Sequence, residues 1–253
     1  MIDQEKTELS CYQVIAKSFS KQGVDLAYGV IGIPVTQLAY EFQKTGIRYI
    51  GMRNEQTASM AAGISGYLKH KSCICLTVSA PGFINGLSGL ANATMNGFPM
   101  ILISGSANTI LAGAHQGDFQ EFDQYSAAKE FAKASFKITD ITNAHRVISR
   151  AVRVAESGRP GGVYIDIPSD VLHQTIFVDV GNNAIYGEKN ESLHDLTPNK
   201  QSVIKAIDML SKVKKPLIII GKGASYSRAE DSLRELVNYT KIPFISSSMV
   251  EEL

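Results

Sequence analysis

Glu55 is the first residue of this chain to consider for chemistry. It follows Asn54, at the point where a strand pattern ends and a helix pattern begins. A carboxylate in the first turn of a helix is stabilised by the helix dipole. The same position is also typical of an ordinary first-turn glutamate, so the pattern alone leaves both interpretations open.

A loop at residues 116–124 gathers three acids, three amides and two aromatic rings. Within it Phe119 stands beside Gln120, and an aromatic ring next to an amide can shape a pocket and donate to a substrate oxygen. His115 lies just before the loop and could act as an acid or a base, although an isolated histidine is more often structural. A solvated acidic loop explains the same composition equally well.

Two turns in the first third of the chain combine small residues with proline. Residues 29–34 (GVIGIP) follow a strand pattern, and their glycines would let the backbone approach a ligand. They lack the spaced glycines of a dinucleotide fingerprint, so a structural turn is the simpler interpretation. Residues 79–82 (SAPG) join a buried strand to a helix whose N-terminus would hold an anion or a carbonyl. An ordinary connection between strand and helix fits these four residues equally well.

Two basic residues lie in glycine-rich turns. Arg159, in the sequence SGRPGG at residues 157–162, is held by a rigid turn and could bind a phosphate through two hydrogen bonds. The alternative is an arginine that caps helix carbonyls or lies on the surface. Lys222, in the sequence GKGA at residues 221–224, opens a helix in a turn suited to phosphate. The spacing is not that of a Walker A motif, and a plain turn with a solvated lysine fits as well.

The overall composition excludes several classes of protein. The 253 residues include 25 basic and 24 acidic side chains, a balance that indicates no nucleic-acid or membrane partner. We expect neither a secretory signal nor a membrane-spanning segment, because no apolar run approaches about 20 residues. Cys11, Cys73 and Cys75 are too few for a disulfide framework and favour a reducing, cytoplasmic location. Cys73 and Cys75 fall in an apolar run, where core packing explains them better than zinc binding.

Helix and strand patterns alternate over residues 8–168. Continuous apolar runs at 73–78 and 100–104 are typical of strands buried on both faces. The alternation predicts an α/β fold with a doubly wound, mostly parallel sheet, in which ligands bind at the carboxyl ends of the strands. The expected helices are 9–22, 34–44, 54–70, 83–96 and 141–156, and the loops to inspect lie near residues 32, 54, 80 and 105–124.

The chain changes character after about residue 180. We expect a first domain at residues 1–180, followed by a linker at 181–200 that is rich in Asn, Gly, Glu and Ser. Residues 201–253 then show two helix patterns and two strand patterns, which are too few for a normal α/β domain. We interpret them as the start of a second, truncated α/β domain.

Taken together and in order, these motifs resemble the thiamine-diphosphate-dependent decarboxylase superfamily. Within it, the sequence is most similar to oxalyl-CoA decarboxylases and to their relatives, the 2-hydroxyacyl-CoA lyases. The resemblance covers nearly the whole chain, which corresponds to the N-terminal half or less of the family's proteins. It is carried by residues 28–36 (YGVIGIPVT), 53–56 (RNEQ), 76–86 (LTVSAPGFING), 98–106 (FPMILISGS), 116–124 (QGDFQEFDQ), 157–164 (SGRPGGVY) and 221–226 (GKGASY).

The resemblance implies three α/β domains with separate tasks. The first binds the aminopyrimidine end of thiamine diphosphate, the middle one contributes to nucleotide and CoA binding, and the third holds the diphosphate and its Mg²⁺. The metal ligands would then lie outside this chain. By the same resemblance, Glu55 hydrogen-bonds the pyrimidine nitrogen N1′ and favours the imino tautomer, and Pro81 contacts the pyrimidine ring.

Contacts to substrate and effector are implied in the same way. Ile33 and Phe119 would border the reactive end of an acyl-CoA substrate, and Arg159 and Lys222 would bind an activating ADP. Phe119 and Gln120 stand where oxalyl-CoA decarboxylases typically carry Tyr-Glu, and Phe-Gln resembles the lyases instead. Because active sites of the family lie between subunits, a homodimer or homotetramer is implied.

Three functions follow as hypotheses. The first is decarboxylation of oxalyl-CoA to formyl-CoA, a step of oxalate catabolism, and the second is cleavage or ligation of a C–C bond in 2-hydroxyacyl-CoA. The third belongs to another class of protein, a non-catalytic module that binds ADP or a partner. A further domain with a Gly-Asp-Gly type of metal motif would favour the two enzymes over the module.

Overall fold

The computed structural model describes residues 6–111, 113, 120–190 and 197–247. The chain divides into two compact units, residues 1–190 and residues 191–253. The first unit contains the large sheet and all the site residues expected up to Arg159, whereas Lys222 belongs to the second unit.

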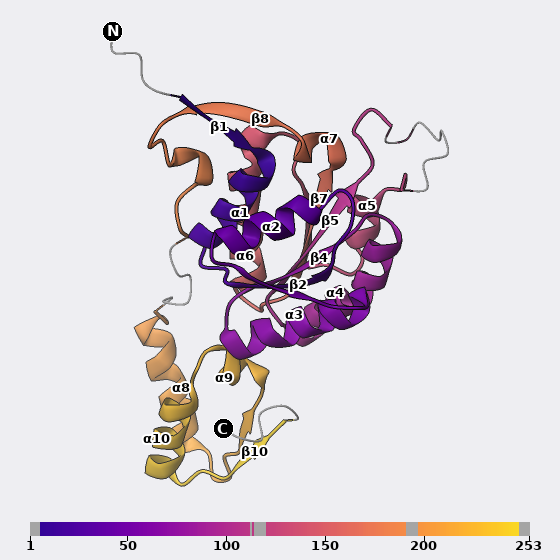
Figure 1. Cartoon of the computed structure of the whole chain (residues 1–253). Coiled ribbons are helices and arrows are strands. Elements are labelled where there is room, and N and C mark those ends of the chain that lie inside the picture. Colours follow the sequence, from indigo (N-terminus) through magenta and orange to yellow (C-terminus); the bar gives the residue numbers. More distant parts are fainter. Residues whose placement is uncertain (1–5, 112, 114–119, 191–196, 248–253) are drawn as a thin grey trace. The chain divides into compact units, whose positions relative to one another are not determined.

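A six-stranded sheet forms the centre of the first unit (Figure 1). In spatial order, its strands are β3 (Arg48–Gly51), β2 (Leu26–Val30), β4 (Cys73–Thr77), β5 (Met100–Ser106), β7 (Gly162–Pro168) and β6 (Ala134–Lys137). Every neighbouring pair is parallel. The prediction of an α/β fold with a doubly wound, mostly parallel sheet is therefore confirmed.

Helices cover both faces of this sheet (Figure 1). One face packs on α1 (Cys11–Lys21), α2 (Thr36–Lys44) and α6 (Ala144–Glu156), and the other packs on α3 (Glu55–Lys69) and α4 (Pro81–Asn96). Residues 73–76 of β4 are apolar because both faces of the strand are buried: Ile74 and Leu76 enter the first core, while Cys73 and Cys75 enter the second. The predicted core packing of these two cysteines is confirmed, and burial raises the pKa of the Cys73 thiol to about 12.

Capping side chains decide where two of the helices begin. The Asn54 side chain accepts a hydrogen bond from the backbone N–H of Thr57 at 3.0 Å, so Asn54 is the N-cap of α3 and the helix begins at Glu55. Ser10 and Gln13 form a reciprocal capping box, so α1 starts at Cys11 rather than at residue 9. The residues before it form β1 (Lys6–Ser10), which pairs antiparallel with β8 (Thr175–Asp179). Shorter elements complete the first unit: α5 (Gln124–Ala128), η1 (Ile141–Asn143), α7 (Ser169–Leu172) and η2 (Ala184–Tyr186).

The second unit holds one parallel strand pair and three helices within its described residues. Its elements are α8 (Lys200–Lys212), β9 (Ile218–Ile220), α9 (Lys222–Tyr226), α10 (Glu230–Thr240) and β10 (Phe244–Ser246). Among the described residues of this unit, only Ile220 and Ile242 have buried side chains, whereas Ile204 and Ile207 of α8 are exposed. Most apolar side chains of this unit thus stay uncovered. Across the described parts of both units, the helices are too short or too polar to span a membrane.

Residues 181–190 bind to α1 of the first unit. Lys21 Nζ donates to the backbone carbonyl of Asn183 at 3.3 Å, and Gln22 Nε2 donates to the carbonyl of Glu188 at 2.6 Å. Side-chain donors of the helix thereby satisfy carbonyls of a segment that has little regular structure of its own.

His145, in the first turn of α6, lies against the same segment. A Cβ atom at Gly187 would lie 3.2 Å from the Cδ2 atom of the imidazole. The Nδ1 atom is buried and has no hydrogen-bond partner among the described residues. Burial, with a smaller contribution from the neighbouring Arg146, lowers the pKa of His145 below its usual value.

Acidification is therefore expected to destabilise the protein through His145. A lowered pKa in the folded state means that the unfolded chain binds the proton more tightly. The free energy of unfolding should then decrease as the pH falls from about 6.5 toward the folded-state pKa. Urea unfolding at a series of pH values measures this slope. His145→Gln should flatten it, while His173→Gln, at an exposed histidine, should not; an unchanged slope in His145→Gln contradicts the prediction.

Candidate functional site

The carboxyl ends of β2 and β4 mark the place where the winding of the sheet reverses. The connection after β2 leads to α2 on one face, and the connection after β4 leads to α4 on the other face. The two strands are neighbours, with Val30 paired to Thr77 at their ends. Ligands of doubly wound sheets bind at such a point because the two connections leave it in opposite directions.

Two loops and the end of strand β5 meet at this edge. A Cβ atom at Gly105, near the end of β5, would lie 2.5 Å from Pro34 Cγ and 3.4 Å from Ser79 Oγ. The connections after β2 and β4 therefore both reach the end of β5, and only glycine fits at residue 105. Tyr12 donates a hydrogen bond from its hydroxyl to the carbonyl of Pro34 at 3.2 Å, which ties the first of these loops to α1.

Glu55 lies at the same edge, as the first residue of α3. Its Oε2 atom accepts a hydrogen bond from Asn85 Nδ2 of α4 at 3.1 Å. A Cβ atom at Gly82 would lie 3.4 Å from Glu55 Oε1 and 2.6 Å from Val78 Cγ2, so a side chain at residue 82 would crowd the carboxylate. The structure thus brings Glu55 to the loop at residues 79–82, two motifs that lie far apart in the sequence.

Buried hydroxyl groups line the ends of β4 and β5. The side-chain oxygens of Thr77, Ser79 and Ser106 are buried and have no hydrogen-bond partner among the described residues. An unpaired buried hydroxyl costs free energy, so these groups favour a polar ligand nearby. With the half-buried carboxylate of Glu55, they make this edge of the sheet polar.

The backbone of this edge is held by a residue that sequence analysis did not single out. Ala80 has the dihedral angles φ 47° and ψ −96°, outside the regions that alanine ordinarily occupies. Its N–H donates to Oε1 of Gln124, the first residue of α5. Gln124 is almost fully buried and also donates from Nε2 to the carbonyl of Gly105 at 2.8 Å.

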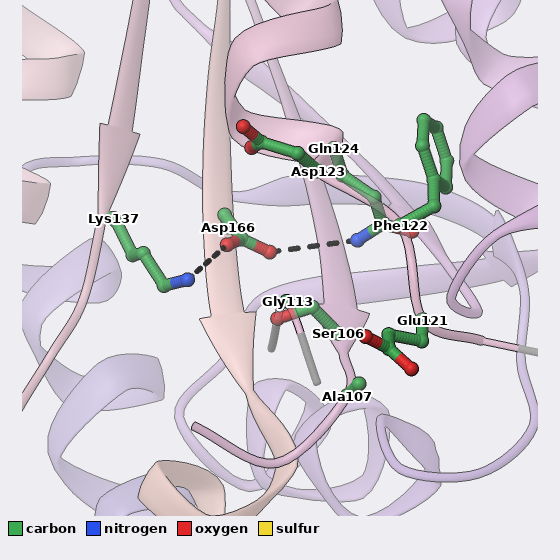
Figure 2. Close-up of a pocket in the computed structure, with 9 residues that line it drawn as sticks. All are labelled: Ser106, Ala107, Gly113, Glu121, Phe122, Asp123, Gln124, Lys137 and Asp166. Carbon is green, nitrogen blue, oxygen red and sulfur yellow. Dashed lines mark hydrogen bonds and ion pairs between the residues drawn. The ribbon is translucent and has the colours of Figure 1, made fainter. Parts of the chain in front are cut away.

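A cavity of about 470 Å³ lies beside Gln124. Figure 2 shows the Asp166 carboxylate between Gln124 and Lys137, with Lys137 Nζ 3.2 Å from Asp166 Oδ2. Asp166 is buried, and burial together with this carboxylate raises the pKa of the neighbouring Tyr164 phenol well above its usual value. The cavity is lined by Ser106, Ala107, Gly113, Glu121, Phe122, Asp123, Gln124, Lys137 and Asp166.

The remaining residues expected near substrate and cofactor are placed as follows. Pro81 is the first residue of α4, is exposed, and lies next to Gly82. Ile33 is 80% exposed in the connection between β2 and α2. Gln120 lies half-buried in the turn that precedes α5, whereas Phe119 lies outside the described residues.

The two cations expected to bind ADP lie in different units. The Arg159 guanidinium donates to the backbone carbonyls of Thr94 and Met95 at the end of α4. It therefore caps a helix, which is the alternative that the sequence had left open. Lys222 is half-buried and opens α9, directly after Gly221 and strand β9.

Gln124, Asp166 and Lys137 are the site residues that sequence reasoning missed. Gln124 was one of three amides in the loop at residues 116–124, with nothing to distinguish it from the others. Asp166 is the one acid within an otherwise apolar strand pattern, a signal that could have identified it. Lys137 lies in β6, a strand that the sequence pattern did not reveal.

Two segments of the chain match known domain families. Residues 9–127 match the family described as "Thiamine pyrophosphate enzyme, N-terminal TPP binding domain". Residues 203–253 match the family described as "Thiamine pyrophosphate enzyme, central domain". The first match includes Glu55, the loop at residues 79–82 and Gln124.

Curated relatives of known name are similar along nearly the whole chain. Oxalyl-CoA decarboxylase of Escherichia coli (strain K12) is 49% identical over 238 residues, which cover 94% of this chain and 42% of that protein. 2-hydroxyacyl-CoA lyase of Arabidopsis thaliana is 46% identical over 238 residues, covering 93% of this chain and 41% of that protein. 2-hydroxyacyl-CoA lyase 1 of Homo sapiens is 40% identical over 247 residues, which cover 98% of this chain and 42% of that protein.

The chain thus spans less than half the length of these relatives. The two domain matches, the parallel sheet and the polar edge that holds Glu55 lead to the same conclusion. The chain belongs to the thiamine pyrophosphate enzyme family and carries sequence of its N-terminal TPP binding domain and its central domain.

Proposed function

We propose that this chain is the N-terminal part of a thiamine-diphosphate-dependent enzyme that converts oxalyl-CoA to formyl-CoA and carbon dioxide. The observation that carries the proposal is the Glu55 carboxylate at the reversal point of the sheet, against the loop at residues 79–82. The 49% identity to oxalyl-CoA decarboxylase of Escherichia coli supports this choice of substrate.

The residues at this edge fit the aminopyrimidine end of thiamine diphosphate. Glu55 keeps one carboxylate oxygen, Oε1, beyond its bond to Asn85, and this oxygen would share a proton with a ring nitrogen. The buried hydroxyls of Ser79 and Thr77 would meet polar groups of the ring. When bound, the cofactor supplies an electron sink for the electron pair that remains after the C–C bond breaks.

Contacts to the other groups are part of the same proposal. Ile33, Phe119 and Gln120 would border the reactive end of the acyl-CoA. The described residues contain no cluster of three or more side chains able to hold a metal, and Mg²⁺ would be bound by a further domain of the protein. Arg159 and Lys222 would contact ADP, for which Arg159 would have to exchange its helix carbonyls for phosphate. We place this enzyme in the cytoplasm, as a homodimer or homotetramer.

A second candidate is cleavage or ligation of the C–C bond in a 2-hydroxyacyl-CoA. It is favoured by Phe119-Gln120, the pair that resembles the lyases. The lyase of Arabidopsis thaliana is nearly as similar as the decarboxylase, at 46% identity. Phenylalanine at residue 119 lacks the phenol O–H that a tyrosine would offer to the second carboxylate of oxalyl-CoA.

Turnover by the full-length protein distinguishes the candidates. The protein is incubated with oxalyl-CoA, thiamine diphosphate and Mg²⁺, and formyl-CoA is measured, with a reaction that lacks thiamine diphosphate as the control. Cofactor-dependent formyl-CoA supports the decarboxylase. No product from oxalyl-CoA, with condensation of formyl-CoA and an aldehyde to a 2-hydroxyacyl-CoA instead, assigns the lyase. Absence of both reactions would leave the non-catalytic module.

A further inference from the structure

The terminal amide of Gln124 connects two backbone groups that lie far apart in the sequence, at Ala80 and at Gly105. Its Oε1 atom accepts from the N–H of Ala80, and its Nε2 atom donates to the carbonyl of Gly105 at 2.8 Å. One group is a backbone donor and the other a backbone acceptor, so the site needs an acceptor and a donor side by side. A neutral amide has this arrangement.

The neighbours of Gln124 determine which way its amide faces. Nε2 lies 3.2 Å from Ser104 Oγ, 3.2 Å from Tyr164 OH and 3.4 Å from Asp166 Oδ1. Each of these groups can accept a hydrogen bond. An ionised Asp166 carboxylate can accept hydrogen bonds but has no hydrogen to donate. The amide nitrogen therefore faces this cluster, which leaves the oxygen for Ala80.

Ala80 needs such a partner because its backbone conformation is strained. With φ 47° and ψ −96°, this non-glycine residue lies outside the ordinary regions and persists only if its surroundings hold it. The next two residues are Pro81 and Gly82, and Gly82 approaches the Glu55 carboxylate. A change at Ala80 would therefore move the loop that faces Glu55.

We infer that Gln124 is a positioning residue, which holds Ala80 so that Pro81 and Gly82 stay in place beside Glu55. This inference rests on the proposed function, since it assigns Gln124 to the cofactor edge of that site. It predicts that the geometry at Ala80 and the affinity for thiamine diphosphate change together.

The first test measures amide hydrogen exchange at Ala80 by NMR in the 253-residue chain. In Gln124→Leu the N–H of Ala80 should exchange at least about tenfold faster than in the wild type, because its acceptor is gone. Tyr164→Phe is the matched control, since it alters the same buried cluster and leaves the bond between Gln124 and Ala80. Unchanged exchange at Ala80 in Gln124→Leu, or equal acceleration in both variants, would overturn the inference.

The second test uses Gln124→Glu, whose function should depend on pH. When protonated, the glutamic acid has a carbonyl for Ala80 and an O–H for Gly105, as the amide does. When ionised, the glutamate has no donor, and it faces the carbonyl of Gly105 and the carboxylate of Asp166. The charged or titratable groups around it are Asp166 and Tyr164 of β7, Lys137 of β6, and Asp123 and Glu121 of its own segment.

The Gln124→Glu variant should therefore recover at low pH. In the full-length protein with Mg²⁺, calorimetric titration with thiamine diphosphate should give affinity near the wild type at low pH and about tenfold weaker affinity at high pH. The exchange rate at Ala80 should follow the same pH profile. Gln43→Glu, at an exposed glutamine, should show neither change.

The outcomes separate this inference from the proposed function. A wild-type protein that binds no thiamine diphosphate overturns the proposed function and, with it, the role of Gln124 toward the cofactor. If Gln124→Leu and Gln124→Glu bind thiamine diphosphate as tightly as the wild type at every pH, the role of Gln124 is overturned and the proposed function stands. A pH-independent loss in Gln124→Glu also contradicts it, because a merely structural defect would not recover on protonation.

Discussion

Replacing Glu55 by alanine in the full-length protein is expected to lower turnover by about 100- to 10,000-fold, the range typical of lost proton transfer. The carboxylate lies where the winding of the sheet reverses. It accepts a hydrogen bond from Asn85 and lies next to Gly82. Alanine cannot share a proton with a ring nitrogen. The fold should persist, because Asn54 still caps α3 and Glu55 itself is not part of the core.

Two further variants show whether the loss belongs to the carboxylate. Glu55→Gln keeps the shape and the contact to Asn85 but removes the ionisable group, so it should lose nearly as much turnover as alanine. Glu130→Gln changes an exposed glutamate of the same domain and should retain wild-type turnover. Turnover and urea unfolding are measured for all three. Full activity in Glu55→Ala would refute the catalytic role, and loss of folding would instead show a structural one.

The Gly66→Ala variant is expected to be destabilised by about 1–3 kcal/mol or more, the cost typical of overpacking. A Cβ atom at Gly66 of α3 would lie 1.9 Å from the carbonyl oxygen of Pro99 and 3.2 Å from the carbonyl oxygen of Lys71. Both are backbone atoms, which cannot rotate away as a flexible side chain would. Helix α3 would have to move away from the face of the sheet, which would loosen the core that it shares with α4.

Gly63 provides a matched control within the same helix. It is also buried, but a Cβ atom there would lie 3.5 Å from Ala93 Cβ, which is an ordinary contact. Gly63→Ala should therefore be neutral or gain about 0.5–1 kcal/mol from the higher helix propensity of alanine. Thermal and urea unfolding of both variants measure the difference. Equal stabilities would show that α3 adjusts freely, and the expected close packing at Gly66 would be wrong.

Most of the sheet could be predicted because its signals are local. The apolar run at 73–78 indicated a strand buried on both faces, and Ile74 and Cys75 do enter opposite cores. Asn54 could be identified as a cap from its place before a helical pattern. Helix starts near proline were less accurate: α2 begins at Thr36 rather than at residue 34, and α4 begins at Pro81 rather than at residue 83.

Other elements depend on partners that are distant in sequence. Strand β6 has only four residues, and it pairs with β7, which follows it along the chain after a complete helix. Strands β1 and β8 pair across more than 160 positions of the chain, Lys6 with Asp179. Short strands of this kind have little periodicity of their own, so their sequences alone could not identify them.

The sequence by itself determined the family resemblance, the alternation of helices and strands, and the candidate residues Glu55 and Pro81. Local periodicity, turn residues and ordered motifs are sufficient for these conclusions. Only the tertiary structure decided which candidates meet, because the strand order β3-β2-β4-β5-β7-β6 brings loops together that lie far apart in the chain. Glu55 contacts Asn85, and Gln124 holds Ala80 across 44 positions, through packing that no local pattern encodes.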